Sequence, residues 1–390
     1  MIDLTLSEKD EQILATVREE ALVCRKYARY YDDHEEEFAP DTLPEAKDFK
    51  NPFALLMKRD ELDSSMGVMS MLVTAGQTWG DYTVRMRRGT GGLGNAALRA
   101  SGTPEQQSRW GGKTLAMAIT EPGCGSDSKA VQTTAVLSGD EWVLNGEKIF
   151  VTTGCRAEGV VVWATIDKSA GRAGIKSFIV MKGTPGFEVT HKEKKLGIRA
   201  DDTAAYVFRD CRIPRDHLLG GDESIPKEGA GGFKGVMKTF NMTRPAVAAI
   251  GLGIAQAALD FTRDALAAEG VEVDWNAGVH GRSAVQQKLI EIEADIEAAM
   301  LCVLHASWLS GESKSNNLEA SISKAKGGEI ARTATQRCIE LCGSLGISLD
   351  HLLEKWFRDC RITDIYEGTG QIQRLIIARD ILGYSAAELS

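Results

Sequence analysis

The sequence predicts a mainly α-helical protein with a central antiparallel β domain, because the spacing of its hydrophobic residues changes twice along the chain. Residues 7–113 carry apolar side chains at helical intervals. Short β-rich runs such as VVVWATI, separated by Gly, Asp and Pro, follow in 115–215. Helical spacing then returns. We therefore predict an N-terminal helical domain at 1–115, a middle β domain at 116–229 and a C-terminal helical bundle at 230–390.

Local signals predict the separate elements. Long helices are predicted at 60–80, 236–268, 282–310, 318–343 and 370–382. In the β part, Asn145-Gly146 between EWVL and EKIF predicts a two-residue hairpin, because a type I′ turn needs positive φ at both positions. Strands and helices do not alternate along the chain, and the Rossmann dinucleotide-binding fingerprint does not occur.

Bulk composition excludes several classes of protein. At 390 residues, with 43% hydrophobic and 26% charged residues, the chain is expected to form two or three packed globular units. The net charge of −9 argues against nucleic-acid binding, and no apolar run approaches the length of a membrane span. The opening residues, MIDLTLSEKDEQ, lack the features of a signal peptide or presequence. We expect a cytoplasmic protein, although a mature organellar chain would look the same.

The eight cysteines favour packing rather than cross-linking or metal binding. They are scattered along the chain without C-x-x-C spacing, which is typical of reduced thiols. Cys338 and Cys342 are one helical turn apart, but no neighbouring His or Cys pair completes a ligand set. We predict no metal site.

Three segments far apart in the sequence carry candidate chemistry. They are AITEPGCGSD at 118–127, KIFVTTG at 148–154 and DIYEGTGQIQR at 364–374. Each alone is compatible with an ordinary turn, strand or helix start. Connecting stretches at 202–203, 208–214, 231–233, 243–249 and 358–361 join them in order.

Together these segments resemble the acyl-CoA dehydrogenase family over nearly the whole chain. The resemblance implies an N-terminal helical domain, a middle antiparallel β domain and a C-terminal four-helix bundle, in agreement with the changes of hydrophobic period. It also implies FAD as cofactor, an acyl-CoA substrate and an electron-transferring flavoprotein as electron acceptor. A homotetramer or homodimer and a role in fatty-acid or lipid catabolism, such as β-oxidation, are further expectations.

The resemblance identifies Glu367, in the Tyr-Glu-Gly-Thr motif, as the catalytic base. The α-proton of a thioester is weakly acidic, and a desolvated carboxylate with a raised pKa is a suitable base. Glu367 would take that proton while flavin N5 accepts a hydride from Cβ, which yields trans-2-enoyl-CoA. Some relatives carry the base immediately before the arginine of the Thr-Arg-Pro segment, where this chain has Thr243, which cannot serve. The alternative role for Glu367 is a helix-capping contact.

The same resemblance implies the binding residues. Thr120 and Thr152 would make polar contacts to the isoalloxazine edge, and Phe150 would pack on the ring. The predicted cofactor-binding residues are Met117, Ile119, Thr120, Ser126, Phe150, Thr152, Thr369 and Gln371. The predicted substrate-binding residues are Ser126, Arg244 and Gly368, with a structural ion pair as the alternative role of Arg244.

Two cofactor segments depart from the family pattern. The usual Arg-x-x-Phe-Gly turn, which reaches the FAD of a neighbouring subunit, is missing from 269–280, and Ser283 stands where a Gln usually follows. The usual Gln-x-x-Gly-Gly-x-Gly reads Glu340-Leu-Cys-Gly-Ser-Leu-Gly346, and a Glu facing the pyrophosphate would repel it. Three interpretations fit: a homo-oligomer with substituted contacts, a hetero-oligomer in which subunits share cofactors, and weak FAD binding.

Other functions on the same scaffold stay open at this point. They are an acyl-CoA oxidase, an enoyl-CoA reductase and a subunit that supports a catalytic partner. The resemblance places the wall of the acyl pocket on helices between about Leu55 and Arg99, and the segment at 80–94 within this range is unusual.

Overall fold

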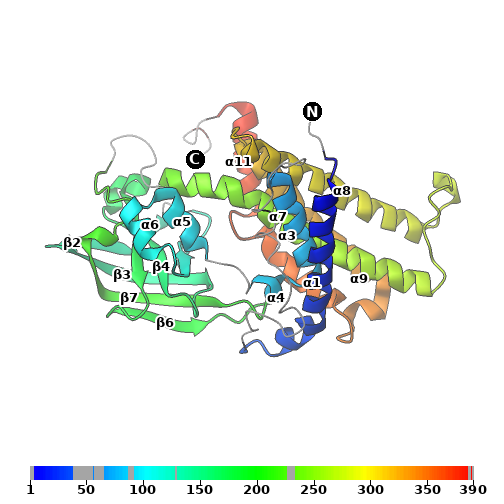
Figure 1. Ribbon diagram of the computed structural model, residues 1–390, viewed down its shortest axis with the longest axis horizontal. Coiled ribbons are helices and arrows are strands. Elements are labelled where there is room, and N and C mark those ends of the chain that lie inside the picture. Colours follow the sequence, from blue (N-terminus) through cyan, green and yellow to red (C-terminus); the bar gives the residue numbers. More distant parts are fainter. Residues whose placement is uncertain are drawn as a thin grey trace. The chain divides into compact units, whose positions relative to one another are not determined.

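The computed structural model describes residues 4–37, 56, 66–86, 92–127, 130–225, 233–384 and 388. Contacts between Cα atoms divide the chain into two compact units (Figure 1). The first unit is Met1–Arg88, Leu196–Ala200 and Asn241–Ser390, and the second is Gly89–Lys195 and Asp201–Phe240. The three-domain division stays a prediction, and its boundary at 229/230 lies outside the described residues.

The first unit is helical. Its N-terminal helices are α1 (Glu8–Asp33), α3 (Met66–Gly80) and α4 (Tyr82–Met86). The later helices are α7 (Phe233–Ala268), which belongs to this unit from Asn241 onward, α8 (Ala284–Gly311), α9 (Asn317–Cys342), α10 (Leu353–Cys360) and α11 (Gly370–Leu382). Helix α1 packs on α3, α3 on α8, and α9 on both α8 and α11. A buried core of alanine, leucine and isoleucine side chains from α7, α8 and α9 fills the space between these helices.

The long predicted helices are present. Helices α7, α8, α9 and α11 begin and end within three residues of the predicted limits. Helix α3 covers 66–80 of the helix predicted at 60–80, and residues 60–65 lie outside the described part. Helix α10 was not predicted, because its eight residues are too few to show a clear period.

Helix α7 contains the most apolar stretch of the chain. Among the described residues, one helix segment, Thr243–Ala268, is long and apolar enough to cross a membrane by length and composition. In the window that meets this criterion, 78% is buried inside the structure. Such burial is typical of the core helix of a globular protein, so the segment is weak evidence for a membrane span.

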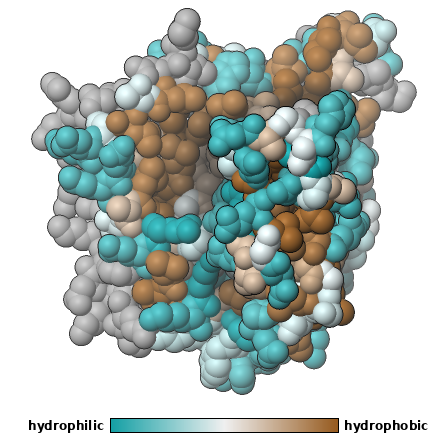
Figure 2. All heavy atoms as spheres, turned by 90° about the vertical axis from the view of Figure 1, so that its right-hand side faces the viewer, coloured by the Kyte–Doolittle hydropathy of each residue, from teal (hydrophilic) through white to brown (hydrophobic). Residues whose placement is uncertain are grey.

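Several large apolar side chains of the first unit are exposed. Figure 2 shows hydrophobic side chains gathered in patches between hydrophilic ones on the face that it draws. The exposed residues towards the C-terminus of this unit include Leu301, Ile347, Leu349, Ile365, Leu375, Ile381, Leu382 and Tyr384. Exposed apolar side chains that gather in patches are typical of a protein interface.

The second unit is built around one sheet. Its strands are β1 (Leu115–Ala118), β2 (Thr134–Ser138), β3 (Glu141–Thr152), β4 (Gly159–Thr165), β5 (Ile175–Met181), β6 (Phe187–Lys192) and β7 (Thr203–Pro214). They lie in the order β1-β4-β2-β3-β7-β6, with β5 beside β4. Helices α5 (Leu93–Ser101) and α6 (Pro104–Trp110) belong to the same unit.

The sheet is mixed rather than purely antiparallel. The predicted antiparallel ladders join β2 to β3, β3 to β7, β4 to β5 and β6 to β7. In addition, β4 pairs in parallel with β1 and, over one residue pair, with β2. Parallel pairing needs a long connection, and the chain between β1 and β4 provides it by forming β2 and β3 on the way.

The hairpin predicted at Asn145-Gly146 is wrong. Strand β3 runs through both residues, and the two-residue turn between β2 and β3 begins at Gly139, whose φ is 66°. Asn145 accepts a hydrogen bond of 2.8 Å from the Asp210 backbone N–H at an irregularity of the β3–β7 ladder. A Cβ on Gly146 would lie 2.4 Å from Thr133 Oγ1. The Asn-Gly pair therefore marks a β-bulge packed against its neighbour.

A buried charged triad joins distant parts of the first unit. Lys355 Nζ on α10 lies 2.6 Å from Asp81 Oδ2 and 2.5 Å from Asp359 Oδ2, and all three side chains are buried. Burial alone would lower the pKa of Lys355, but the two carboxylates raise it above its ordinary value. Asp359 also accepts a hydrogen bond of 2.5 Å from the Ile198 N–H. The triad thus ties α10 to the start of α4 and to 196–200.

We predict that Lys355→Met lowers the free energy of unfolding by about 3–5 kcal/mol, because it leaves two buried carboxylates without a counter-ion. Urea denaturation followed by circular dichroism measures this change. Lys326→Met is the matched control, since the Lys326 side chain is 57% exposed and its loss should cost less than about 0.5 kcal/mol. Equal losses in the two variants would contradict the role of the triad.

Candidate active site

The turn before α11 has an unusual backbone. Glu367 and Gly368 have φ values of 56° and 88°, and a positive φ is uncommon for a residue with a side chain. Gln373 holds this turn, because its Nε2 donates hydrogen bonds of 3.1 and 3.2 Å to the carbonyl oxygens of Glu367 and Gly368. Thr369 is the N-cap of α11, and its hydroxyl accepts a 3.3 Å hydrogen bond from the first turn. The conformation of residue 367 is therefore set by its neighbours.

The Glu367 carboxyl lies against α7. The Thr243 hydroxyl donates a short hydrogen bond to it. Burial raises the pKa of Glu367 above its ordinary range, although the Thr243 hydrogen bond and the positive charges of Lys324 and Arg244 lower it. A desolvated carboxyl with a raised pKa is suited to accept a proton. Thr243, identified as unable to be a base, is thus a direct partner of Glu367.

Arg244, the next residue on α7, is 2% exposed. Its Nη1 donates to Asn241 Oδ1 at 2.9 Å and to Ser321 Oγ at 3.4 Å, and both partners are neutral. Within the part of the chain that the structure describes, no carboxylate lies within ion-pair distance of Arg244. The ion-pair role is therefore not observed there, and substrate binding by Arg244 stays a prediction.

In the second unit, the Gly-rich turn after β1 is anchored by a buried ion pair. Lys148 Nζ donates to Glu121 Oε1 at 2.7 Å and to the Ile119 carbonyl at 2.9 Å. The Glu121 carboxylate also accepts backbone hydrogen bonds from Gln132 at 2.6 Å and from Thr133 at 2.9 Å. Burial alone would raise the pKa of Glu121, but Lys148 and these hydrogen bonds hold it below its ordinary value. The pair fixes the backbone on both sides of Thr120.

Sequence reasoning missed this pair, although a signal was present. Glu121 follows the apolar run that opens one segment already singled out, and Lys148 opens a second segment that is otherwise free of charge. Opposite charges next to apolar runs are expected to pair when they are buried, because an unpaired buried charge is costly. Gln373 was missed for a different reason. Gln371 was chosen by resemblance, but Gln371 is exposed whereas Gln373 is buried and contacts the turn.

The predicted flavin-contacting residues of the second unit lie near the surface. Thr120 and Thr152 are half-buried, as are Met117 and Ile119, and Ser126 is exposed. Phe150 is 58% exposed and has a φ of 55° at an irregularity of β3. The Ile149 N–H donates to the Thr120 carbonyl at 3.0 Å, so the two segments lie side by side.

These residues fit a flavin ring. The hydroxyls of Thr120 and Thr152 make no hydrogen bond to other described residues of the chain, so they are available to a ligand. The exposed Phe150 ring offers an apolar surface of the kind on which an aromatic heterocycle stacks. The structure thus brings the predicted residues together in two groups, one on each unit: Met117, Ile119, Thr120, Ser126, Phe150 and Thr152, and Arg244, Glu367, Gly368, Thr369 and Gln371.

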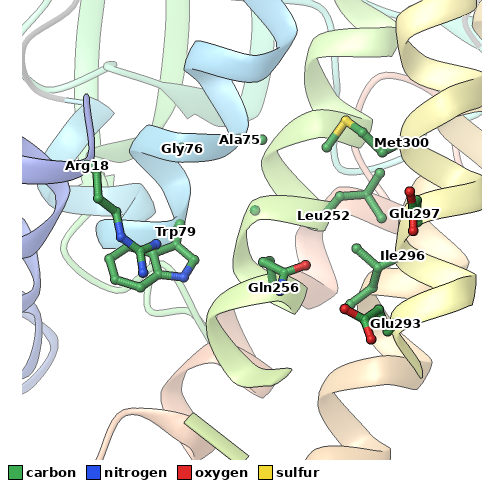
Figure 3. Close-up of a pocket in the computed structure, with 11 residues that line it drawn as sticks. Arg18, Ala75, Gly76, Trp79, Leu252, Gln256, Glu293, Ile296, Glu297 and Met300 are labelled. Atoms are coloured by element: carbon green, nitrogen blue, oxygen red, sulfur yellow. The ribbon is translucent and has the colours of Figure 1, made fainter. Parts of the chain in front are cut away.

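A separate cavity of about 350 Å³ lies between α1, α3, α7 and α8 (Figure 3). The guanidinium of Arg18 stacks over the Trp79 ring at 3.0 Å on one side of it. Glu293, Ile296 and Met300 of α8 line the opposite side. None of the predicted site residues lines this cavity.

Comparisons with known proteins agree with these observations. The acyl-CoA dehydrogenase middle-domain family matches residues 116–211, and the acyl-CoA dehydrogenase C-terminal domain family matches residues 230–382. The mitochondrial short-chain specific acyl-CoA dehydrogenase of Bos taurus is 35% identical over 379 residues, which cover 92% of this chain and 88% of that protein.

Solved structures give the same result. Butyryl-CoA dehydrogenase from Megasphaera elsdenii is similar with a TM-score of 0.80 and 29% identity, covering 98% of this chain and 100% of that one. A chain of the structure described as the electron transferring flavoprotein of Acidaminococcus fermentans has a TM-score of 0.79 and 30% identity, with 98% and 100% coverage. The predicted fold class is confirmed by these similarities.

We predict that Gln373→Ala lowers the free energy of unfolding by about 1–3 kcal/mol, because two carbonyl groups of a strained turn lose their donor. Gln336→Ala on α9 is the control, since Gln336 is exposed and its partner is Glu340 on the same helix. Urea denaturation measures both variants. If Gln373→Ala were no less stable than Gln336→Ala, the side chain would not hold the turn.

Proposed function

This chain belongs to the acyl-CoA dehydrogenase family, and on that premise we propose that it oxidises short-chain acyl-CoA thioesters to trans-2-enoyl-CoA with Glu367 as the base. Members of this family are FAD-dependent flavoproteins, and the chain is an oxidoreductase that acts on acyl-CoA. The observation that carries the proposal is the desolvated carboxyl of Glu367, a half-buried residue whose carboxylate is held by Thr243. The preference for short chains is supported by the relative from Bos taurus, whose name specifies it.

Glu367 performs the proton transfer in this proposal. One carboxylate oxygen accepts the Thr243 hydrogen bond, which orients the group and leaves the other oxygen for the α-proton. Burial makes the Glu367 carboxylate more basic than a carboxylate in water. The difference in proton affinity between this carboxylate and the α-carbon of the thioester is therefore smaller. FAD supplies the acceptor for the hydride that leaves Cβ. Proton and hydride then leave adjacent carbons of the substrate.

The thioester carbonyl needs a hydrogen-bond donor as charge develops on its oxygen. The backbone N–H of Glu367 makes no hydrogen bond to other described residues, and the residue has a positive φ. We propose that this N–H polarises the carbonyl. Gly368, Ser126 and Arg244 would contact the CoA thioester, and Met117, Ile119, Thr120, Ser126, Phe150, Thr152, Thr369 and Gln371 would contact FAD.

We further propose that an electron-transferring flavoprotein accepts the electrons and that the chain forms a homo-oligomer. The first proposal is supported by the similarity to a chain in the Acidaminococcus fermentans structure. The second is supported by the exposed apolar side chains of α11, among them Leu375, Ile381 and Leu382. A hetero-oligomer that shares FAD is the second candidate, because 269–280 lacks the usual cofactor motif and Glu340 replaces a Gln.

We predict that Glu367→Gln retains FAD but lowers kcat for butyryl-CoA by a factor of roughly 10²–10⁴. Flavin absorbance measures cofactor binding, and anaerobic bleaching by substrate measures reduction. The exposed Glu312 offers a control, and Glu312→Gln should react at the wild-type rate. Wild-type reduction by Glu367→Gln would exclude this residue as the base.

The pH dependence of kcat/KM follows from the raised pKa of Glu367. A base acts in its deprotonated form, so activity is expected to increase with pH through the pKa of Glu367 in the free enzyme. The midpoint should lie above the ordinary pKa of a glutamate. A pH profile with its acidic limb at or below that ordinary value would contradict burial of the base.

The cofactor content of the chain expressed alone separates the two assemblies. A homo-oligomer predicts one FAD per chain, measured from flavin absorbance and protein mass, in a particle whose size is given by light scattering. A shared cofactor predicts fewer FAD than chains and a gain of flavin when a partner subunit is added.

A further inference from the structure

Lys324 is a buried cation that the proposed chemistry does not yet use. Its side chain on α9 is 0% exposed. Its Nζ makes no hydrogen bond and no ion pair within 4 Å among the described residues. A buried amine without a partner is costly in free energy, and such groups gather at functional sites.

The geometry of α9 directs Lys324 toward the turn that carries Glu367. Ser321, Lys324 and Gly328 are three and four residues apart, so they lie on one face of the helix. At one end of this face, Ser321 Oγ accepts from Arg244, which follows the partner of Glu367 on α7. At the other end, a Cβ on Gly328 would lie 3.0 Å from Asp364 Cα. Lys324 is therefore placed between a contact to α7 and a contact to the segment that leads into Glu367.

The charged groups that act on Lys324 come from each of these elements. Asp364 and Glu367 attract its ammonium, and Arg244 repels it. Asp364 Oδ1 is also buried without a hydrogen-bond partner. The region around Lys324 therefore contains two carboxyls and two cations that make few direct hydrogen bonds to one another. Arg244 is engaged by Asn241 and Ser321, whereas Lys324 has no such engagement. Of the two cations, Lys324 is therefore the one whose positive charge has no direct hydrogen-bond partner among the described residues.

We propose that Lys324 is a positioning residue of the proton transfer, whose buried ammonium keeps the Glu367 carboxylate ionised and ready before substrate binds. Burial of a carboxylate favours its protonated form, and that form cannot accept the α-proton. A nearby cation in a low-dielectric environment opposes this effect. Lys324 exchanges no proton in the step itself, since the α-proton moves from the substrate carbon to a Glu367 oxygen.

The charge of Lys324 is available where the enzyme is expected to work. Burial lowers the pKa of Lys324 to about 8, and the neighbouring carboxyls oppose this shift. Its ammonium is therefore present at neutral pH and is lost above about pH 8. At a pH above the pKa of Glu367 its carboxylate is ionised with or without the ammonium, so Lys324 is expected to contribute only at lower pH.

Substituting Lys324 by Met tests this inference, which rests on the proposed function for its effect on catalysis. Met has a similar length and no charge, and replacing a buried charge by an apolar side chain is often neutral for stability. Infrared difference spectra of the FAD-bound protein, recorded against pH, follow the carbonyl band of protonated Glu367, which is identified by its absence in Glu367→Gln. The pH profile of kcat/KM for butyryl-CoA is measured on the same proteins, and thermal denaturation confirms that they are folded.

Lys324→Met is expected to raise the infrared midpoint of Glu367 by about one pH unit or more, a tenfold change in its proton affinity. The acidic limb of kcat/KM should move with it, while the plateau at high pH keeps the wild-type value. Lys324→Arg should return both toward wild type. The matched control is Lys326→Met, which removes an exposed cation two residues away on the same helix and should leave both unchanged.

The two proposals fail in different ways. An unchanged infrared midpoint in Lys324→Met, or an equal shift in Lys326→Met, overturns the role of Lys324. A uniform loss of rate at every pH with an unchanged midpoint shows a merely structural role and also overturns it. A shifted midpoint with an unshifted kcat/KM profile supports the electrostatic link between Lys324 and Glu367, and it overturns Glu367 as the base.

Discussion

The desolvation of one carboxyl, that of Glu367, is the constraint on which the candidate site depends. A buried carboxyl is a stronger base than an exposed one, but it also tends to stay protonated. The structure meets both demands because it desolvates the carboxyl of this half-buried residue and places the Thr243 hydroxyl and the positive charges of Arg244 and Lys324 where they act on it. The backbone at this position is unusual, since Glu367 has a positive φ and its N–H makes no hydrogen bond to other described residues.

Each unit secures its functional segment with buried polar contacts. In the helical unit, Gln373 holds the carbonyl groups of the turn, and the Lys355 triad ties α10 to the chain around it. In the sheet unit, Glu121 and Lys148 hold the backbone on both sides of Thr120. Such contacts add less stability than apolar packing would, because desolvation offsets most of their attraction. Their benefit is a single conformation, which a residue that must meet a ligand requires.

Sequence patterns predicted elements correctly where apolar residues repeat at helical spacing over a long segment. They failed where a turn was predicted from one dipeptide. Helices α7, α8, α9 and α11 follow from their repeated apolar spacing. Asn145-Gly146 has the composition of a hairpin turn, yet β3 continues through it. The competing requirement there was tertiary, because Thr133, the residue before β2, lies where a side chain at Gly146 would be. Gln371 and Gln373 show the same limit, since only the packing of α11 decides which of them is buried.

The sequence by itself determined the fold class, the family and the identity of Glu367 as candidate base, because hydrophobic period and ordered motifs are properties of the chain read in one dimension. Tertiary structure alone decided the partners of that base. These partners come from three helices: Thr243 from α7, Lys324 from α9 and Gln373 from α11. No rule of sequence spacing relates them to Glu367. Their effects act through space, by hydrogen bonding, burial and charge, so the proton affinity of the base follows from the three-dimensional arrangement.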